Sequence, residues 1–271
     1  DSVAEQIDEI LADCEQLVGT YHDPEPGAMV RIALSPSDPF NASNELMARS
    51  AELGDKLDIQ LHTHLAESPD ETRHCMENFG MRPTERFEHL GWGSDRSWGA
   101  HAIFVNDDEI NKLAVWGTGI AHCPSSNIFH NRRATPVQKM REAGVPVGLG
   151  CDGSASSGHG SLWLEARIAM LVGHLVDDRP RLTARDVLEM ATVGGAACLG
   201  RTGELGVLTE GAAADLVVWP LDEISSMGVH DDLIEGWLRG GPALPLHSFV
   251  GGNPVVLNRQ LVDNRLSEMI G

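Results

Sequence analysis

The 271-residue sequence predicts an α/β fold with a parallel sheet, followed by part of a smaller β domain. Short apolar runs alternate with helical patterns five times before residue 200. These runs are almost continuously apolar, as parallel strands are when helices cover both faces of their sheet. After residue 200 the chain is glycine-rich and then strand-like, with a hairpin expected over 248–263. We therefore expect one domain over 1–200 and another over 201–271.

The strands are predicted from short apolar runs that glycine, proline or polar residues bound. They cover 29–35, 57–67, 97–105, 119–124 and 145–153. Because a helical pattern follows each run, we expect parallel pairing. Five such units are too few to close an eight-stranded barrel. Either the sheet is open, or three further units are missing on the N-terminal side.

The helices are predicted from apolar residues at helical spacing. They cover 3–18, 43–54, 69–90 with a break near Gly80, 107–117, 135–144, 161–175 and 183–200. Gly54 and Gly117 are expected to end two of these helices. Thr135, with Pro136 at the first helical position, is expected to cap one helix, and Thr183 to cap another.

Composition and charge exclude several classes of function. The chain has 40 acidic and 20 basic residues, a formal charge of −20, which disfavours nucleic acid and anionic membranes as partners. No apolar run reaches the roughly 18 residues of a membrane-spanning helix, and the acidic first residues do not form a signal peptide. The five cysteines are spread out without a CxxC, so we expect no disulfide framework and a cytoplasmic location.

Residues with metal-binding chemistry follow four consecutive strands. His64, in an HxH pair with His62, ends one strand, and His101, His122 and Asp152 follow the next three. Taken singly, each histidine is expected to be a packed core residue and the aspartate a turn residue. Because the carboxyl ends of parallel strands converge, we expect the set to gather at one place. Nitrogen and oxygen ligands with water fit a divalent metal.

A metal with an open position makes water available as a nucleophile near neutral pH. Glu67 or Asp152 could take a proton from that water and pass it to a leaving group. His101 could polarise the electrophile or hold the attacking water. The residues therefore predict metal-assisted hydrolysis at a carbon that bears a leaving nitrogen or halide.

Five segments carry a resemblance to a known family. They are HTHLAE (62–67), AHAIF (100–104), AHCPSSN (121–127), GLGCDGSAS (148–156) and GELGVLTEGAAADLVV (203–218). Together they resemble the amidohydrolase superfamily, in its branch of purine and triazine aminohydrolases, over essentially the whole chain. The resemblance implies a (β/α)8 barrel of the metal-dependent hydrolase type, with its N-terminal strands missing from this chain, plus part of a small β-sandwich domain.

The resemblance also implies roles for matching positions. His64 and Asp152 would bind one Zn²⁺ per subunit, with Fe²⁺ as the alternative. Glu67, His101 and Asp152 would be catalytic: Glu67 shuttles protons, His101 hydrogen-bonds the water or the substrate, and Asp152 acts as base. Glu67 and His101 would also contact the substrate.

Ser156 would also contact the substrate, and His62 would be structural. His159 is expected to contact the substrate because it lies in the GHG loop that follows Asp152. The family carries another HxH pair on its first barrel strand, and no such pair precedes residue 57 here. Ser157 stands where relatives usually have Asn, and Cys151 stands where Val or Thr is common.

The implied activity is hydrolytic deamination of an aminated heterocycle. We expect 8-oxoguanine or a related oxopurine as substrate. A triazine that loses an amine or chloride at the same site is one alternative, and a non-catalytic scaffold is another. The expected partner is this small molecule, with neither nucleic acid nor membrane, and the chain is expected to form a homo-oligomer.

Overall fold

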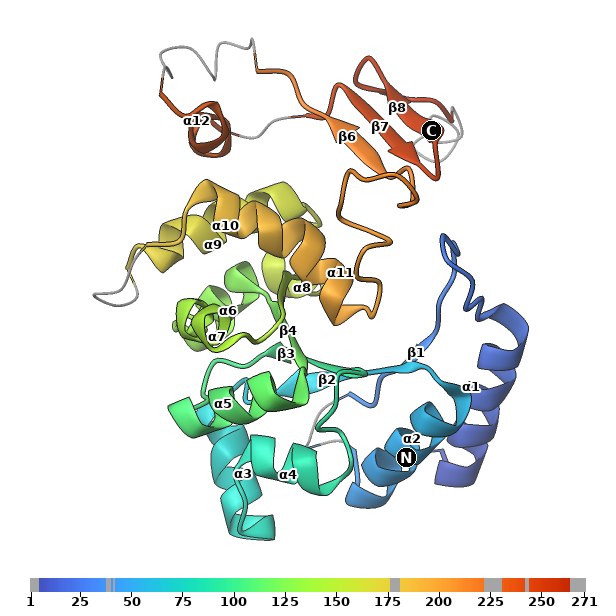
Figure 1. Cartoon of the computed structure of the whole chain (residues 1–271). Coiled ribbons are helices and arrows are strands. Elements are labelled where there is room, and N and C mark those ends of the chain that lie inside the picture. The colour runs from blue at the N-terminus through green and yellow to red at the C-terminus, as the bar shows by residue number, and fades with distance from the viewer. Residues whose placement is uncertain are drawn as a thin grey trace.

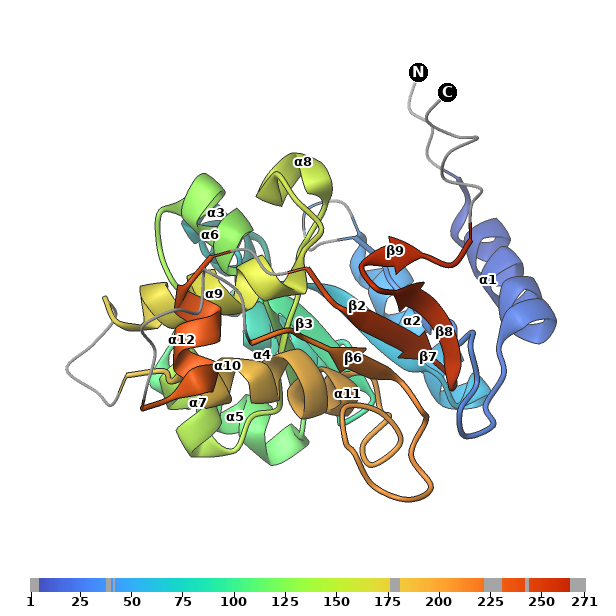
Figure 2. The same ribbon diagram turned by 90° about the horizontal axis from the view of Figure 1, so that it is seen from above.

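Two sheets organise the chain. The structure, a computed structural model, describes residues 5–37, 40, 42–175, 181–221, 231–241 and 244–263. A five-stranded parallel sheet has the order β1-β2-β3-β4-β5, and a four-stranded antiparallel sheet has the order β6-β7-β8-β9. The antiparallel sheet lies above the parallel sheet, on the side of α9 to α11 (Figures 1 and 2).

Each parallel strand lies within a predicted run and is shorter than that run. The strands are β1 (Ala33–Leu34), β2 (Gln60–Leu65), β3 (Ser97–His101), β4 (Gly119–His122) and β5 (Val147–Leu149). Burial alternates along β2, so Leu61, Thr63 and Leu65 are buried while His62 and His64 lie on the other face. This alternation places both imidazoles on the same side of the sheet, as the HxH spacing predicts.

The helices before β4 confirm the predicted ones in position. They are α1 (Ile7–Tyr21), α2 (Asn44–Leu57), α3 (Pro69–Phe79), α4 (Pro83–His89) and α5 (Asp107–Trp116). Residues 3 and 4 of the first predicted helix lie outside the described residues. The predicted break at Gly80 is confirmed, because this glycine ends α3 in the left-handed conformation, as Gly117 ends α5.

The later helices are α6 (Pro124–Asn131), α7 (Val137–Ala143), α8 (Ser154–Ser157), α9 (Leu162–Gly173), α10 (Ala184–Glu189), a π-helical turn η1 (Met190–Gly194), α11 (Gly195–Cys198) and α12 (Leu233–Arg239). Of these, α6, α8 and α12 were not expected from the sequence. The expected helix over 183–200 is divided into α10, η1 and α11, and Thr183 caps it with a capping box, as predicted.

Two predicted helix boundaries are wrong. Helix α2 does not end at Gly54 but continues to Leu57, and Asp58 adopts the left-handed cap. Gly54 is needed for close packing, because a Cβ there would meet the side chain of Leu61 on β2 at 2.7 Å. Thr135 does not cap α7: Pro136 occupies the cap position, and the Thr135 hydroxyl instead donates to the carbonyl oxygen of His101 (2.6 Å).

The main core lies between the parallel sheet and its helices. Its largest fully buried side chains include Trp92, Leu113, Met140, Met170 and Met190. The three methionines fill this core. All five cysteines are free thiols. Within the described ranges, no helix is both long and apolar enough to cross a membrane.

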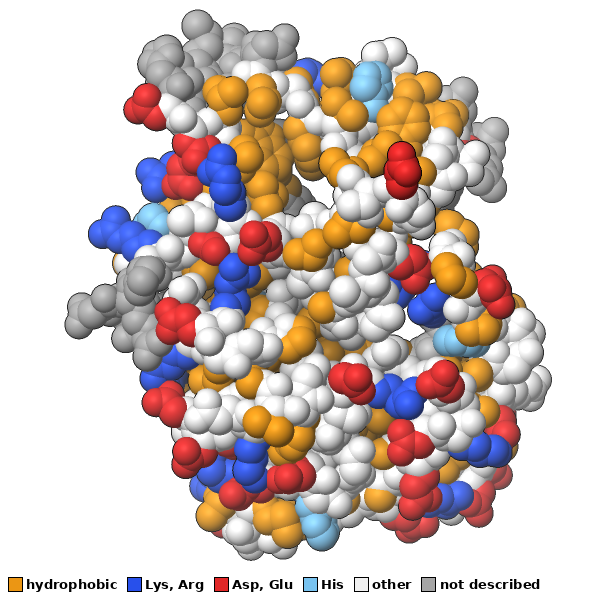
Figure 3. Space-filling model, in the orientation of Figure 1, with side chains coloured by type: hydrophobic (Ala, Val, Ile, Leu, Met, Phe, Trp, Pro, Cys, Tyr) orange, Lys and Arg blue, Asp and Glu red, His pale blue; other side chains and the backbone are white. Residues whose placement is uncertain are grey.

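The antiparallel sheet comprises β6 (Leu216–Val218), β7 (His247–Val250), β8 (Asn253–Leu257) and β9 (Gln260–Leu261). The predicted hairpin over 248–263 is confirmed, with its turn at Gly251 and Gly252. An apolar cavity of about 590 Å³ separates β6 from α9 and α10, and three tryptophans line it: Trp163, Trp219 and Trp237. Figure 3 shows apolar side chains gathered at this level, between α12 and the antiparallel sheet.

Two adjacent glycines test how tightly η1 packs against β5. A Cβ on Gly194 would collide with the backbone carbonyl of Val147, whereas a Cβ on Gly195 would make only an ordinary contact, 3.7 Å from the Met190 oxygen. We expect Gly194→Ala to lower the free energy of unfolding by about 1–3 kcal/mol, the usual cost of overpacking. Gly195→Ala is the control and should leave stability equal or higher, because alanine favours the helix. Equal stability of both variants in denaturant unfolding would contradict this packing.

Candidate metal and catalytic site

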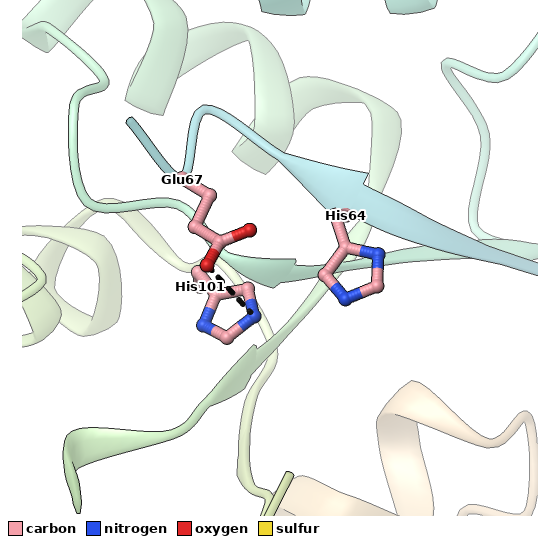
Figure 4. Close-up of side chains that lie close together, drawn as sticks. All are labelled: His64, Glu67 and His101. Carbon is pink, nitrogen blue, oxygen red and sulfur yellow. Dashed lines mark ion pairs between the residues drawn. The ribbon is translucent and has the colours of Figure 1, made fainter. Parts of the chain in front are cut away.

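The parallel register brings two histidines side by side. His64 pairs with Ala100 and Leu65 pairs with His101, so β2 and β3 end next to each other. The rings of His64 and His101 stack with centroids 5.3 Å apart. Glu67 lies in the turn after β2, and its carboxylate points toward His101 (Figure 4). One ligand atom from each of His64, Glu67 and His101 lies within 4.8 Å of the others.

The backbone turns sharply where these strands end. Ala66, His101, Ala102 and Asp152 all have positive φ, between 46° and 72°. For residues other than glycine, such a conformation costs about 1–3 kcal/mol and is typical of functional sites. The turns therefore point the side chains that follow β2, β3 and β5 out of the strand direction and toward one another.

A buried carboxylate holds the turn after β2. Glu71, 2% exposed, accepts the backbone N–H groups of Ala66 (2.9 Å) and Glu67 (2.7 Å). Burial raises the pKa of Glu71 to about 7, although both N–H donors oppose this rise. Glu71 was not singled out from the sequence. Its only signal there is its place in the first turn of a helix, one of many acidic residues at helix starts.

The protonation of His64 is set by a backbone carbonyl. Its Nδ1 lies 2.5 Å from the carbonyl oxygen of Ser37, which follows β1. A carbonyl can only accept, so Nδ1 carries the proton and Nε2 keeps its lone pair in the neutral ring. This is the arrangement in which a histidine binds a metal through Nε2.

His101 is almost fully buried, at 1% exposure, and lies between two carboxylates. Its Nε2 is 3.9 Å from Glu67 Oε1 and 4.0 Å from Asp152 Oδ2. Its Nδ1 is 2.8 Å from Asn127 Oδ1. Thus Asp152, predicted from sequence to join this group, lies beside it although β4 separates β3 from β5.

Asp152 is held as a carboxylate. Burial raises its pKa, but hydrogen bonds from the Ser126 side chain and the Gly153 N–H, together with His101 and His64, outweigh this effect. The pKa of Asp152 is therefore below its ordinary value, and the group is ionised at neutral pH. An ionised carboxylate beside unprotonated imidazole nitrogens is suited to binding a cation.

The remaining predicted residues lie around this group. His62 stacks on Trp98 (4.8 Å), and its Nδ1 faces the Trp98 carbonyl at 3.2 Å. Burial lowers the pKa of His62, which fits the structural role implied for it. His122 is buried, and burial together with His101 lowers its pKa to about 3. It is therefore a neutral core histidine and does not join the ligand cluster.

Ser156 and His159 lie in the segment that follows Asp152. Ser156 is part of α8, and its backbone N–H donates to the carbonyl of Gly153 (2.9 Å). His159 Nε2 lies 3.3 Å from Ser125 Oγ and 3.4 Å from Glu165 Oε1. Its predicted contact with substrate stays a prediction, because here its ring nitrogen faces protein partners.

The donor chemistry fits a divalent metal ion. Two imidazoles present unprotonated Nε2 atoms, and a carboxylate lies within reach of both. Zinc takes such nitrogen and oxygen ligands at about 2.0–2.2 Å, so groups around one ion lie within a few ångströms of each other. His64, Glu67 and His101, with Asp152 adjacent, are the residues that could hold it.

Several curated proteins are similar in sequence to this chain. The 8-oxoguanine deaminase of Pseudomonas aeruginosa is 43% identical over 84% of this chain and 51% of its own length. The hydroxydechloroatrazine ethylaminohydrolase of Pseudomonas sp. strain ADP is 40% identical over 86% of this chain and 48% of its own length. The chain thus spans about half the length of these relatives.

Solved structures agree with this similarity. A zinc complex of atrazine chlorohydrolase from Arthrobacter aurescens superposes with a TM-score of 0.93 at 37% identity, over 98% of this chain and 59% of that one. A zinc-bound adenosine deaminase from Xanthomonas campestris superposes with a TM-score of 0.91 at 28% identity, over 98% and 60%. The sequence profile of the Amidohydrolase family matches residues 3–253, and the chain therefore belongs to the amidohydrolase family.

Proposed function

We propose that this chain forms the greater part of the active site of a metal-dependent hydrolytic deaminase. Its substrate would be an aminated heterocycle, with 8-oxoguanine or a related oxopurine as first choice. The observation that carries the proposal is the gathering of Glu67, His101 and Asp152 beside His64. Similarity to an 8-oxoguanine deaminase supports the substrate class.

The reaction adds water to the ring carbon that bears the amino group and then breaks the carbon–nitrogen bond, releasing ammonia. A divalent cation, when bound, supplies the Lewis acidity that makes water nucleophilic near neutral pH. Asp152, ionised before the reaction, takes a proton from the attacking water. Glu67 gives a proton to the ring nitrogen as the water adds. When the carbon–nitrogen bond breaks, the departing amine takes the proton held by Asp152, and the proton of the new hydroxyl group returns to Glu67 as the carbonyl forms. His101 accepts a hydrogen bond from the water through its unprotonated Nε2.

We also propose zinc as the metal, at one ion per subunit, with His64 and Asp152 as ligands and Fe²⁺ as the alternative. Two solved relatives are described as zinc complexes. Ser156 and His159 are proposed to contact the substrate together with Glu67 and His101. We also propose that the protein is a homo-oligomer.

We propose that residues 1–200 are the C-terminal part of a (β/α)8 barrel and that 201–271 are part of a small β-sandwich. Five parallel strands are too few for such a barrel, and the chain spans about half the length of its relatives. The remaining strands, with two further histidine ligands, would come from polypeptide outside this sequence. The apolar cavity beside β6 supports a further element against the antiparallel sheet.

An ammonia-release screen tests the reaction. We expect the full-length, zinc-loaded protein to release ammonia from oxopurines faster than from pterins, pyrimidines or triazines. Release of chloride or alkylamine from a triazine, with no ammonia from any purine, would favour the triazine alternative. Absence of both turnover and stoichiometric metal would favour a non-catalytic scaffold.

Asp152→Asn tests the proposed base. Asparagine tolerates the left-handed backbone at this position and keeps the size of the side chain, so the fold should persist. We expect kcat to fall by about 10²–10⁴-fold, the range for removal of a general base. Asp58→Asn is a matched control, since Asp58 is also an aspartate with positive φ but is exposed at the end of α2. Unchanged turnover in Asp152→Asn would remove Asp152 from the mechanism.

A further inference from the structure

We propose that the first turn of α6 is a positioning platform for the site. The platform consists of Ser125, Ser126 and Asn127, in the AHCPSSN segment that follows β4. Each of its residues bonds to a different part of the site: Ser125 to the His159 region, Ser126 to Asp152, and Asn127 to His101. The effect of the platform on kcat rests on the proposed function, whereas its hydrogen bonds are present in the structure whatever the reaction.

The platform is polar and yet fully enclosed. Ser125, Ser126 and Asn127 are 6%, 1% and 0% exposed. A buried polar side chain is costly unless its hydrogen bonds are made, so these residues must be satisfied by protein partners. A helix turn that only covered the sheet would present apolar side chains here. The polar sequence is therefore explained by what these side chains bind.

Asn127, Thr135 and His101 form a closed hydrogen-bonded ring. The Thr135 hydroxyl lies 2.6 Å from the carbonyl oxygen of His101, to which it must donate its single proton. The same hydroxyl can then only accept from Asn127, whose Nδ2 is 2.9 Å away. The Asn127 amide is thereby oriented, and its Oδ1 must face His101 Nδ1 at 2.8 Å.

These hydrogen bonds among Asn127, Thr135 and His101 fix the tautomer of His101. Because Asn127 Oδ1 only accepts, Nδ1 of His101 carries the proton and Nε2 keeps its lone pair. That lone pair is directed to the side where Glu67 and Asp152 lie. The Thr135 hydroxyl also binds the carbonyl oxygen of His101, a residue whose backbone is strained at a φ of 72°. One hydroxyl thus stabilises both the unusual backbone and the protonation of the catalytic imidazole.

The two serines hold the segment that follows β5. The Ser126 side chain hydrogen-bonds to Asp152, whose Oδ1 accepts the Gly153 N–H and whose Oδ2 lies 4.0 Å from His101 Nε2. The Ser125 N–H donates to Glu165 Oε2 (3.1 Å), a carboxylate with no exposed surface. Glu165 Oε1 lies 3.4 Å from His159 Nε2.

His159 is held between the platform and the start of α9. Its Nδ1 accepts the N–H of Ser161 (3.2 Å), so in the neutral ring Nε2 carries the proton and faces Ser125 and Glu165. The platform therefore fixes residues from β3 and from beyond β5 relative to each other. Ser125, Ser126, Asn127 and Thr135 are positioning residues, and the catalytic groups remain His101 and Asp152.

Thr135→Val tests the ring with nearly unchanged shape, because it replaces only the hydroxyl. Without that donor and acceptor, the Asn127 amide is free to turn and His101 can take either tautomer. We expect kcat to fall by about 10–100-fold, the usual effect of losing a group that orients a site histidine. KM should change less than about twofold, and zinc content should be unchanged. Thr135→Ser restores the hydroxyl and should rescue most of the lost kcat.

Thr84→Val is the matched control. Thr84 is also fully buried, on α4, but among the residues that the structure describes its hydroxyl has no hydrogen-bond partner. The same substitution there should leave kcat and thermal stability unchanged, since no bond is lost. Equal loss of kcat in Thr84→Val and Thr135→Val, or failure of Thr135→Ser to rescue, would overturn the platform.

A tautomer measurement tests the platform without any activity. Long-range ¹H–¹⁵N spectra of ¹⁵N-histidine-labelled protein report which ring nitrogen is protonated, and His101→Asn assigns the signal. We expect the Nδ1–H form for His101 in the wild type; the Nε2–H form would overturn the proposal. If the wild type turns over no heterocycle but shows Nδ1–H, the proposed function fails and the platform stands.

Discussion

The common direction of strands β2 to β5 is the constraint on which the site depends. Because the strands are parallel, their carboxyl ends lie along one edge, and pairing of Leu65 with His101 sets the two imidazole-bearing ends level. Adjacent strands are about 4.8 Å apart, which matches the stacked rings of His64 and His101. Asp152 starts two strands away from β3, and the left-handed turn at this residue lets it reach the group.

The strand between β3 and β5 contributes support instead of a ligand. His122 ends β4 but is buried and held neutral, with a pKa lowered to about 3 by burial and by His101. A second positive charge at this place would oppose a bound cation, so a neutral filler is compatible with a metal site. The polar side chains that contact the site come directly after His122, in the first turn of α6. There Asn127 bonds to His101, at the end of β3, and Ser126 bonds to Asp152, after β5.

Much of the fold could be predicted because apolar runs and helical periods are local properties. The five parallel strands and the hairpin follow from these local patterns. The proximity of His64, Glu67, His101 and Asp152 follows from the strand ends and from the resemblance. Helix α6 could not, because its first turn is polar and buried and so has the composition of a loop. Thr135 before a proline is typical of a helix cap, but the His101 carbonyl is a distant partner that no local pattern reveals.

The two histidines acquire the same tautomer from opposite sides of the site. Ser37, after β1, fixes His64 on β2, whereas Asn127, after β4, fixes His101 on β3. The two histidines therefore lie on the neighbouring strands β2 and β3, and the segments that follow the flanking strands β1 and β4 supply the acceptors. Without the acceptors that follow β1 and β4, His64 and His101 could each adopt either tautomer. The tautomers of the two histidines thus depend on four neighbouring strands, β1 to β4, and Asp152 joins them from the end of the fifth.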